Sequence, residues 1–226
     1  MRPMLAVLLA GLVLAPAPRE SALSSEPEGW VDLLADPTLK DWSRVPLGAA
    51  GALRAGDAGD PSPWKLDPSG PVLVCEGGKA GHEMLRHAAE WGDHILHVEW
   101  RFTKLDGEPP YNSGIYVRTS ADGTIWHQAQ TGAAGGFLFG NTLVNGAPQR
   151  VNLRQAMTEN RVKPAGEWNT YEIQATGSRI GLWVNGAVTS EFNGCEVPKG
   201  HLGLEAEGFR IEFRNLKVKR LVSPEP

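Results

Sequence analysis

The feature that most constrains the fold of this chain is an alternation of apolar and polar residues with a period of two. It is clearest at residues 94–103, HILHVEWRFT, where Leu96, Val98, Trp100 and Phe102 alternate with polar or charged residues. Successive side chains of a β-strand point to opposite faces, whereas the apolar residues of an amphipathic helix recur about every 3.6 residues. The pattern therefore predicts a strand with one apolar face and one polar face.

Similar strands are predicted at residues 112–118, 171–176, 179–185, 188–192 and 199–216. Asn185-Gly186 is a strong hairpin signal, because both residues tolerate a positive φ. At Arg214-Asn215 the alternation changes phase by one residue, which predicts a β-bulge. Helical patterning is limited to a turn or two within residues 151–157. Strands joined by tight turns indicate an all-β protein made of two packed antiparallel sheets.

Length and composition limit the possible classes of protein. A chain of 226 residues with 41% hydrophobic content can bury one sizeable core, so a single domain is expected. The formal net charge of −4 provides no basic field that would hold nucleic acid or anionic lipid. The shared parity of apolar residues within the strands predicts that the core contains Leu96, Val98, Trp100, Phe102, Ile173, Leu182, Val184, Leu204, Ile211 and Phe213.

The N-terminus has the pattern of a signal peptide. Arg2 precedes an apolar run at residues 4–15, and Ala15-Pro16-Ala17 and a Ser-rich stretch follow. A helix needs about 20 apolar residues to span a bilayer, so this run is too short for a membrane anchor. We expect a signal peptide at residues 1–24. No Cys follows closely that could carry a lipid, so the protein is expected to be secreted or periplasmic and free of the membrane after cleavage.

Export to an oxidising compartment permits disulfides, and the chain has two cysteines. Cys75 ends the apolar run PVLVC, and Cys195 lies in the loop EFNGCEVP. They could form one bridge that closes a long loop, or remain as two separate buried thiols. The sequence leaves both alternatives open.

Four motifs in a fixed order carry a family resemblance. They are NSGIYVR from Asn112, KPAGEWNTYEI from Lys163, LWVNG from Leu182 and IEFRNLKV from Ile211. With these motifs the chain resembles the 3-keto-disaccharide hydrolase family over residues 28–222. The resemblance implies a concanavalin-A-like jelly-roll β-sandwich and action on 3-keto-glycosides.

The polar faces of the strands supply the candidate site residues. Glu205 and Glu207 share one face at a spacing of roughly 7 Å, where burial could raise the pKa of one carboxyl and leave the other ionised. They are the candidate acid and base, although the sequence does not say which is which. Arg101 is a candidate electrostatic stabiliser. The side chains expected to bind sugar hydroxyls in the same concavity are Asn112, Arg118, Gln128 and Gln130.

One segment departs from the family pattern. The resemblance implies Glu-x-Gln followed by an acid, whereas the matching segment here, IWHQAQTGAAGG, places Gln128 at the Glu position and Gln130 at the Gln position. Glutamine keeps the size and hydrogen bonding of glutamate but cannot accept a proton. His127 could replace the missing base, although neighbouring residues of a strand face opposite ways.

Metal and nucleotide chemistry have little support in the sequence. His94 and His97 are three positions apart on a strand and therefore point to opposite faces, and no HExxH motif or Cys/His cluster occurs. The glycines of residues 132–141 precede no helical pattern, so they do not form a phosphate loop. No cofactor is expected, and structural Ca²⁺ is not indicated.

The function expected from the resemblance is hydrolysis of 3-keto-glycosides by elimination and hydration. The main alternative is a non-catalytic, lectin-like carbohydrate-binding module, which the Gln at position 128 favours. A retaining glycosidase would need two carboxylates about 5–5.5 Å apart on either side of the scissile bond. The sugar, its linkage and the oligomeric state are not specified by the sequence.

Overall fold

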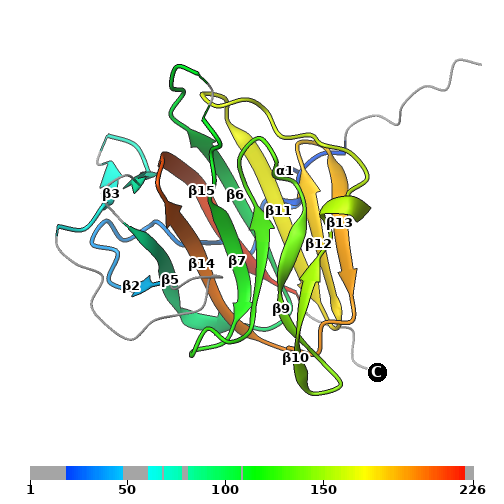
Figure 1. The fold of residues 1–226 in the computed structure, drawn as a ribbon. Coiled ribbons are helices and arrows are strands. Elements are labelled where there is room, and N and C mark those ends of the chain that lie inside the picture. The colour runs from blue at the N-terminus through cyan, green and yellow to red at the C-terminus, as the bar shows by residue number, and fades with distance from the viewer. Residues whose placement is uncertain (1–18, 48–60, 68, 78–80, 108, 222–226) are drawn as a thin grey trace, which may run out of the picture.

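The computed structural model describes residues 19–47, 61–67, 69–77, 81–107 and 109–221. The regular secondary structure of these residues is almost entirely strand, with one short helix, α1 (Ala22–Ser25), and a 3₁₀ turn at Arg154–Ala156. The strands are β1 (Val31–Asp32), β2 (Trp42–Pro46), β3 (Trp64–Asp67), β4 (Val72–Glu76), β5 (His82–Trp91), β6 (His94–Phe102), β7 (Gly114–Thr119), β8 (Trp126–Gln130), β9 (Leu138–Val144), β10 (Ala147–Asn152), β11 (Asn169–Thr176), β12 (Arg179–Val184), β13 (Ala187–Asn193), β14 (Gly200–Glu207) and β15 (Arg210–Arg220) (Figure 1).

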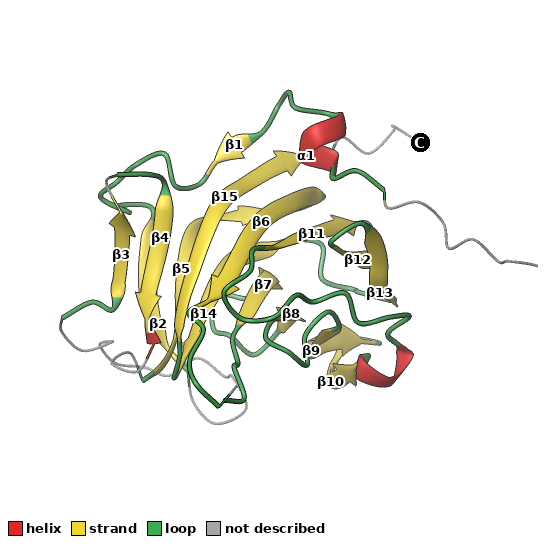
Figure 2. Ribbon diagram, turned by 90° about the horizontal axis from the view of Figure 1, so that it is seen from above, coloured by secondary structure: helices red, strands yellow, loops and turns green. Residues whose placement is uncertain are grey.

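The strands form two sheets that pack face to face (Figure 2). Sheet A has the order β13-β12-β11-β6-β15-β4-β3, with β1 paired to β15, and sheet B has the order β10-β9-β8-β7-β14-β5-β2. The described pairings are antiparallel, as in the central pairs of β14 with β7 and of β15 with β6. The predicted all-β sandwich of two antiparallel sheets is confirmed.

The core lies between the sheets and contains the residues that the alternation predicted. All ten predicted core side chains are buried, and each is at most 2% exposed. Burial of one large apolar side chain contributes about 1.5–3 kcal/mol, so these residues account for much of the stability of the sandwich.

The hairpin predicted at Asn185-Gly186 joins β12 to β13. Asn185 has a φ of 43° and Gly186 a φ of 109°, and Val184 pairs with Ala187 across the turn. Two positive φ values in a two-residue turn match the twist of the flanking strands. The Asn185 side chain accepts a hydrogen bond from the Thr170 amide at 2.8 Å, which ties the turn to β11.

The bulge predicted at Arg214-Asn215 is present in β15. Arg214 pairs with Glu99 and Lys217 with His97, so β15 has one residue more than β6 over this stretch. Asn215 has a φ of 47°. The extra residue changes the parity of the strand, and apolar residues on both sides of it can therefore face the same core.

The N-terminal segment lies against sheet A. The amides of Ala22 and Leu23 donate to the Glu172 carboxylate at 2.7 and 3.1 Å, and the Arg19 amide donates to the Gly186 carbonyl. Residues 1–18 of the expected signal peptide lie outside the described residues. A cleavage near Ser24 would remove these contacts. No helix among the described residues is long and apolar enough to cross a membrane.

The two cysteines are separate buried thiols rather than a disulfide. Cys75 lies in β4, where it pairs with Ile211 and Trp64, and burial raises the pKa of its thiol to about 12. Cys195 follows β13 and accepts a weak hydrogen bond from the Arg118 guanidinium. The fold is held together without a cross-link between them.

Candidate functional site

A pocket of about 210 Å³ opens on the outer face of sheet B. Its walls come from β5, β7, β8, β9, β10 and β14 and from the loop before β7. The residues that line it are His82, Asn112, Tyr116, Trp126, Gln128, Gln130, Phe139, Arg150, Glu205 and Glu207.

The alternation of inward and outward side chains that forms the core also places these side chains in the pocket. In β14, Leu204 and Ala206 point into the core, so Glu205 and the neighbouring Glu207 point to the outer face. Gly114 provides space for one of the amides. A Cβ at Gly114 would lie 1.7 Å from Nε2 of Gln128, so any larger residue there would displace that side chain.

Glu205 is a buried carboxylate held by three donors. Its Oε1 accepts hydrogen bonds from the Tyr116 hydroxyl at 2.8 Å and from Nε2 of His82 at 2.7 Å. Its Oε2 accepts a hydrogen bond from Nε2 of Gln128 at 2.8 Å. Burial, followed by the charge of Glu205, raises the pKa of Tyr116 well above its usual value, so the phenol remains a donor. The network fixes the orientation of Glu205.

Glu207 is half-buried and stands beside Glu205 on the pocket wall. The Gln130 amide donates to Oδ1 of Asn112, whose Nδ2 donates to Glu207, so two amides orient this carboxylate in series. Burial raises the pKa of Glu207, and the neighbouring charge of Glu205 raises it further. The two carboxylates therefore have different environments, as a division into proton carrier and fixed anion requires.

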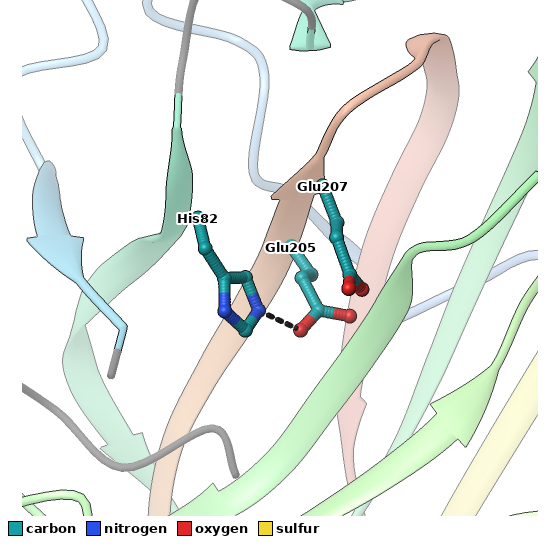
Figure 3. A group of neighbouring side chains, drawn as sticks. All are labelled: His82, Glu205 and Glu207. Atoms are coloured by element: carbon teal, nitrogen blue, oxygen red, sulfur yellow. Dashed lines mark hydrogen bonds and ion pairs between the residues drawn. The ribbon is translucent and has the colours of Figure 1, made fainter. Parts of the chain in front are cut away.

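His82 completes this wall of the pocket (Figure 3). It pairs with Glu207 across β5 and β14, and its hydrogen bond to Glu205 raises the pKa of the imidazole. The ligand atoms of His82, Glu205 and Glu207 lie within 4.8 Å of one another, a spacing that a cation could bridge. All three side chains already form hydrogen bonds within the protein, so their polar atoms have partners without a cation.

Arg150 supplies a guanidinium to the other side of the pocket. Its Cζ lies 4.6 Å from the centre of the Trp126 ring and 5.3 Å from that of Phe139. Stacking on aromatic faces holds the cation while leaving its donors free to reach a ligand. Arg150 is exposed, so this group is open to solvent.

Five of the eight candidate residues from the sequence line this pocket. They are Asn112, Gln128, Gln130, Glu205 and Glu207. Their juxtaposition follows from strand parity, and their individual roles stay predictions. The missing acid at position 128 has a structural counterpart, because the Gln128 amide donates to Glu205 and so places a carboxylate from β14 at hydrogen-bond distance.

The expectation that Arg118 lies in this concavity is wrong. Tyr116 pairs with Gly203 and Thr119 with His201, so β7 has one extra residue here, and Arg118 has a φ of 47°. This bulge turns Arg118 into the interior, where it is 0% exposed and bound to Asp93 at 2.9 Å. Its guanidinium holds the inside of the sandwich together.

Arg101 and His127 also lie away from the pocket. Arg101 is on the outer face of sheet A, where it binds Glu212 at 2.7 Å and stacks on Trp168. The polar face of β6 was predicted correctly, but β6 belongs to sheet A, whereas the pocket lies on sheet B. His127 points into the core, opposite to Gln128, and donates or accepts at the Thr142 hydroxyl at 2.8 Å. Burial lowers the pKa of His127 to about 4, so the ring is neutral.

Sequence reasoning missed His82 and Arg150. β5 has little apolar–polar alternation, because Glu83 is buried in it by an ion pair with Arg44, so the pattern does not mark His82 as a strand residue. β10 is exposed except at Val151, so it has no apolar face that would mark a strand. The available signal for Arg150 was Asn145-Gly146, a two-residue hairpin turn with positive φ at both positions that pairs β10 with β9.

Comparisons with solved structures find proteins of the same fold. A protein from Parabacteroides distasonis ATCC 8503 that carries the name of a glycosyl hydrolase aligns with a TM-score of 0.60 at 16% identity, over 91% of this chain and 100% of that chain. The carbohydrate-binding module CBM66 from Bacillus subtilis aligns with a TM-score of 0.55 at 14% identity, over 79% of this chain and 95% of that chain. At these identities the similarity shows a shared fold.

A comparison with curated proteins found no match. A comparison with protein families matches residues 29–219, nearly the whole described sandwich, to the 3-keto-alpha-glucoside-1,2-lyase-like domain. The match covers both sheets and the pocket between β5 and β10. The chain therefore belongs to the family of 3-keto-alpha-glucoside-1,2-lyase-like domains.

Proposed function

We propose that the protein is a secreted or periplasmic enzyme that cleaves 3-keto-glycosides by elimination followed by hydration. Its family is carbohydrate-active and its fold is that of carbohydrate-related proteins. The observation that carries the proposal is the pair of neighbouring carboxylates in one pocket, of which Glu205 is fixed by three donors and Glu207 has a raised pKa.

The chemistry needs a base at C2 of the sugar. A ketone at C3 makes the C2 proton acidic, and a carboxylate whose pKa is raised toward neutrality is a stronger base than an ordinary one. Glu207 meets this requirement because it is half-buried beside Glu205. Both oxygens of Glu205 already accept hydrogen bonds, so its role is to hold the neighbouring groups in place.

The charge that develops on the C3 oxygen needs a donor. Arg101 and Arg118 are outside the pocket, and Arg150 is the arginine among the described residues that line it. A guanidinium aimed at a developing enolate contributes transition-state stabilisation without proton transfer. The amides of Asn112, Gln128 and Gln130 are suited to the hydroxyls of the same sugar ring.

The placement of the two carboxylates, rather than their spacing, argues against a retaining glycosidase. Such an enzyme places its carboxylates on opposite sides of the scissile bond. Glu205 and Glu207 are two positions apart on one strand and stand on one wall, together with His82. This arrangement favours groups that act on adjacent atoms from the same side.

Replacement of Glu207 by Gln tests the proposal. Glu207→Gln keeps the size of the side chain but removes its proton chemistry, so turnover of a 3-keto-disaccharide should fall by roughly 10²–10⁴-fold with little change in binding. Glu90→Gln is the matched control, because Glu90 lies on β5 of the same sheet, outside the pocket, in an exposed pair with Lys199. Released monosaccharide is the readout.

Either of two results would contradict the proposal. Full activity of Glu207→Gln would remove Glu207 from the mechanism. A wild-type protein that binds sugars but releases no monosaccharide from any 3-keto-glycoside would identify a lectin-like binding module instead.

A further inference from the structure

We propose that His82 is a catalytic residue of this pocket, which protonates the departing oxygen at C1 while Glu205 holds its imidazole in position. The inference deepens the proposed function and rests on it. Sequence patterning assigns His82 no role, and no comparison assigns one. Its location beside both carboxylates is the starting point (Figure 3).

The spacing of the cluster fits proton transfer to adjacent atoms of one sugar. His82 faces Glu207 directly across β5 and β14. One ring nitrogen of His82 and one carboxylate oxygen each of Glu205 and Glu207 lie within 4.8 Å of one another. The proton on C2 and the oxygen on C1 belong to neighbouring carbons. A base and an acid that stand this close on one wall can reach both from the same side.

Glu205 is built to hold an imidazolium. Its side chain is 4% exposed, whereas the side chain of His82 is 31% exposed, so the anion is buried and the ring stays open to the pocket. The Tyr116 hydroxyl and the Gln128 amide fix both oxygens of Glu205. A buried carboxylate that orients a histidine and stabilises its charged form is the same division of labour as in hydrolase triads.

The titratable and charged groups around His82 come from three strands. Glu205 and Glu207 face it from β14, while the Tyr116 phenol on β7 and the Arg150 guanidinium on β10 line the same pocket. The two carboxylates are the nearest charges. The hydrogen bond to Glu205 is the main reason why the imidazole pKa is raised, which favours the protonated ring.

The two half-reactions balance with these residues alone. In the elimination, the Glu207 carboxylate takes the C2 proton, a double bond forms between C1 and C2, and the C1–O bond breaks. The protonated His82 keeps its Nε2 proton on Glu205 and gives its Nδ1 proton to the departing oxygen. In the hydration, the oxygen of a water molecule bonds to C1, a proton from that water goes to His82, and Glu207 returns its proton to C2. One water is consumed and both residues regain their starting state.

The leaving group provides the decisive test. An alcohol or a sugar must be protonated as it departs, whereas 4-nitrophenolate departs without a proton. We expect His82→Gln and His82→Ala to lower kcat by roughly 10²–10⁴-fold on a 3-keto-disaccharide, but by about tenfold or less on 4-nitrophenyl 3-keto-glucoside. Added imidazole should restore part of the activity of His82→Ala on the disaccharide.

His201→Ala is the matched control. His201 is half-buried on β14, paired with β5, and its Nδ1 interacts with the His87 carbonyl at 3.1 Å, outside the pocket. This variant should retain activity and show no response to imidazole. His82→Gln retains a donor toward Glu205, so it keeps the test valid if His82→Ala does not fold.

The outcomes separate the two proposals. Equal losses on both substrates, or no loss in His82→Gln while the wild type cleaves both, would overturn the role of His82 and leave the proposed function standing. A wild type that cleaves neither substrate would overturn both. A selective loss on the disaccharide, together with rescue by imidazole, would establish His82 as the acid.

Discussion

Individual residues in this protein show how one local irregularity can change the role of a charge. Arg118 occupies a position that would be polar and outward in a regular strand, but the bulge in β7 turns it into the core. There it binds Asp93 at 2.9 Å and donates to the Gly177 carbonyl at 2.7 Å. The residue therefore serves stability, because it ties β7 to the β11–β12 turn.

Replacement of Arg118 should destabilise the fold strongly. Arg118→Ala removes one partner of a buried ion pair, which typically costs about 3–5 kcal/mol. Arg101→Ala, on the outer face of sheet A, should cost about 1 kcal/mol or less, because its guanidinium is partly exposed to solvent. Urea denaturation gives both free energies of unfolding, and equal losses in the two variants would contradict the assignment.

At the scale of single elements, the sequence predicts those turns and bulges that change the apolar–polar alternation or need residues with positive φ. The Asn185-Gly186 hairpin and the bulge at Asn215 were predicted because both have local signals, two residues that tolerate positive φ and a phase change. The bulge at Arg118 was not, because NSGIYVR continues its alternation through the irregularity. A bulge without a phase change in hydrophobicity leaves no trace in the pattern.

The candidate site was also predicted only in part, because strand parity was again the available signal. Glu205, Glu207 and the three amides were placed on one surface by their parity. Arg101 was misplaced because alternation says which residues of a strand share a face, but not which of two sheets the strand joins. That information lies in long-range pairing, such as that of β6 with β15, which a single sequence does not display.

The segment before β1 is an element whose role depends on where the mature chain begins. The amides of Ala22 and Leu23 satisfy Glu172, which also binds His97 at 2.9 Å within sheet A. We expect a chain that starts at Glu26 to be less stable by about 1–3 kcal/mol than one that starts at Arg19, because Glu172 loses two donors.

Urea denaturation of both chains, with and without Glu172→Gln, measures this coupling. The difference between the two starting points should shrink when the substitution is present, since a neutral amide depends less on the lost donors. A difference that is unaffected by the substitution would show that the segment acts through other contacts. N-terminal sequencing of the protein isolated from its native cells would show which start is natural.

The whole molecule should be sensitive to mild acid because it buries neutral histidines. Burial lowers the pKa values of both His94 and His127 to about 4, against an unfolded value of 6.5. Between these values the unfolded chain binds protons that the folded chain does not, so stability is present above pH 6.5 and is lost as the pH falls. The two residues together contribute a slope of about 2.7 kcal/mol per pH unit.

Urea denaturation between pH 4.5 and pH 6.5 would measure this slope. His94→Gln and His127→Gln should each flatten it by about 1.4 kcal/mol per pH unit, whatever their effect on the absolute stability. His201→Gln, at a half-buried position, is the comparison variant. A slope unchanged in all three variants would contradict the assignment of neutral buried rings.

The last two strands among the described residues, β14 and β15, lie in the middle of the two sheets. β14 is placed between β7 and β5, and β15 between β6 and β4 (Figure 1). Ile211 pairs with Phe102, so this contact must wait until the ribosome has made residue 211. Before then both sheets lack a central strand, so the nascent polypeptide stays unfolded during synthesis. A β-sandwich that closes only after β15 is made stays unfolded until then, and an unfolded chain is what a translocation channel would accept if the expected leader directs export.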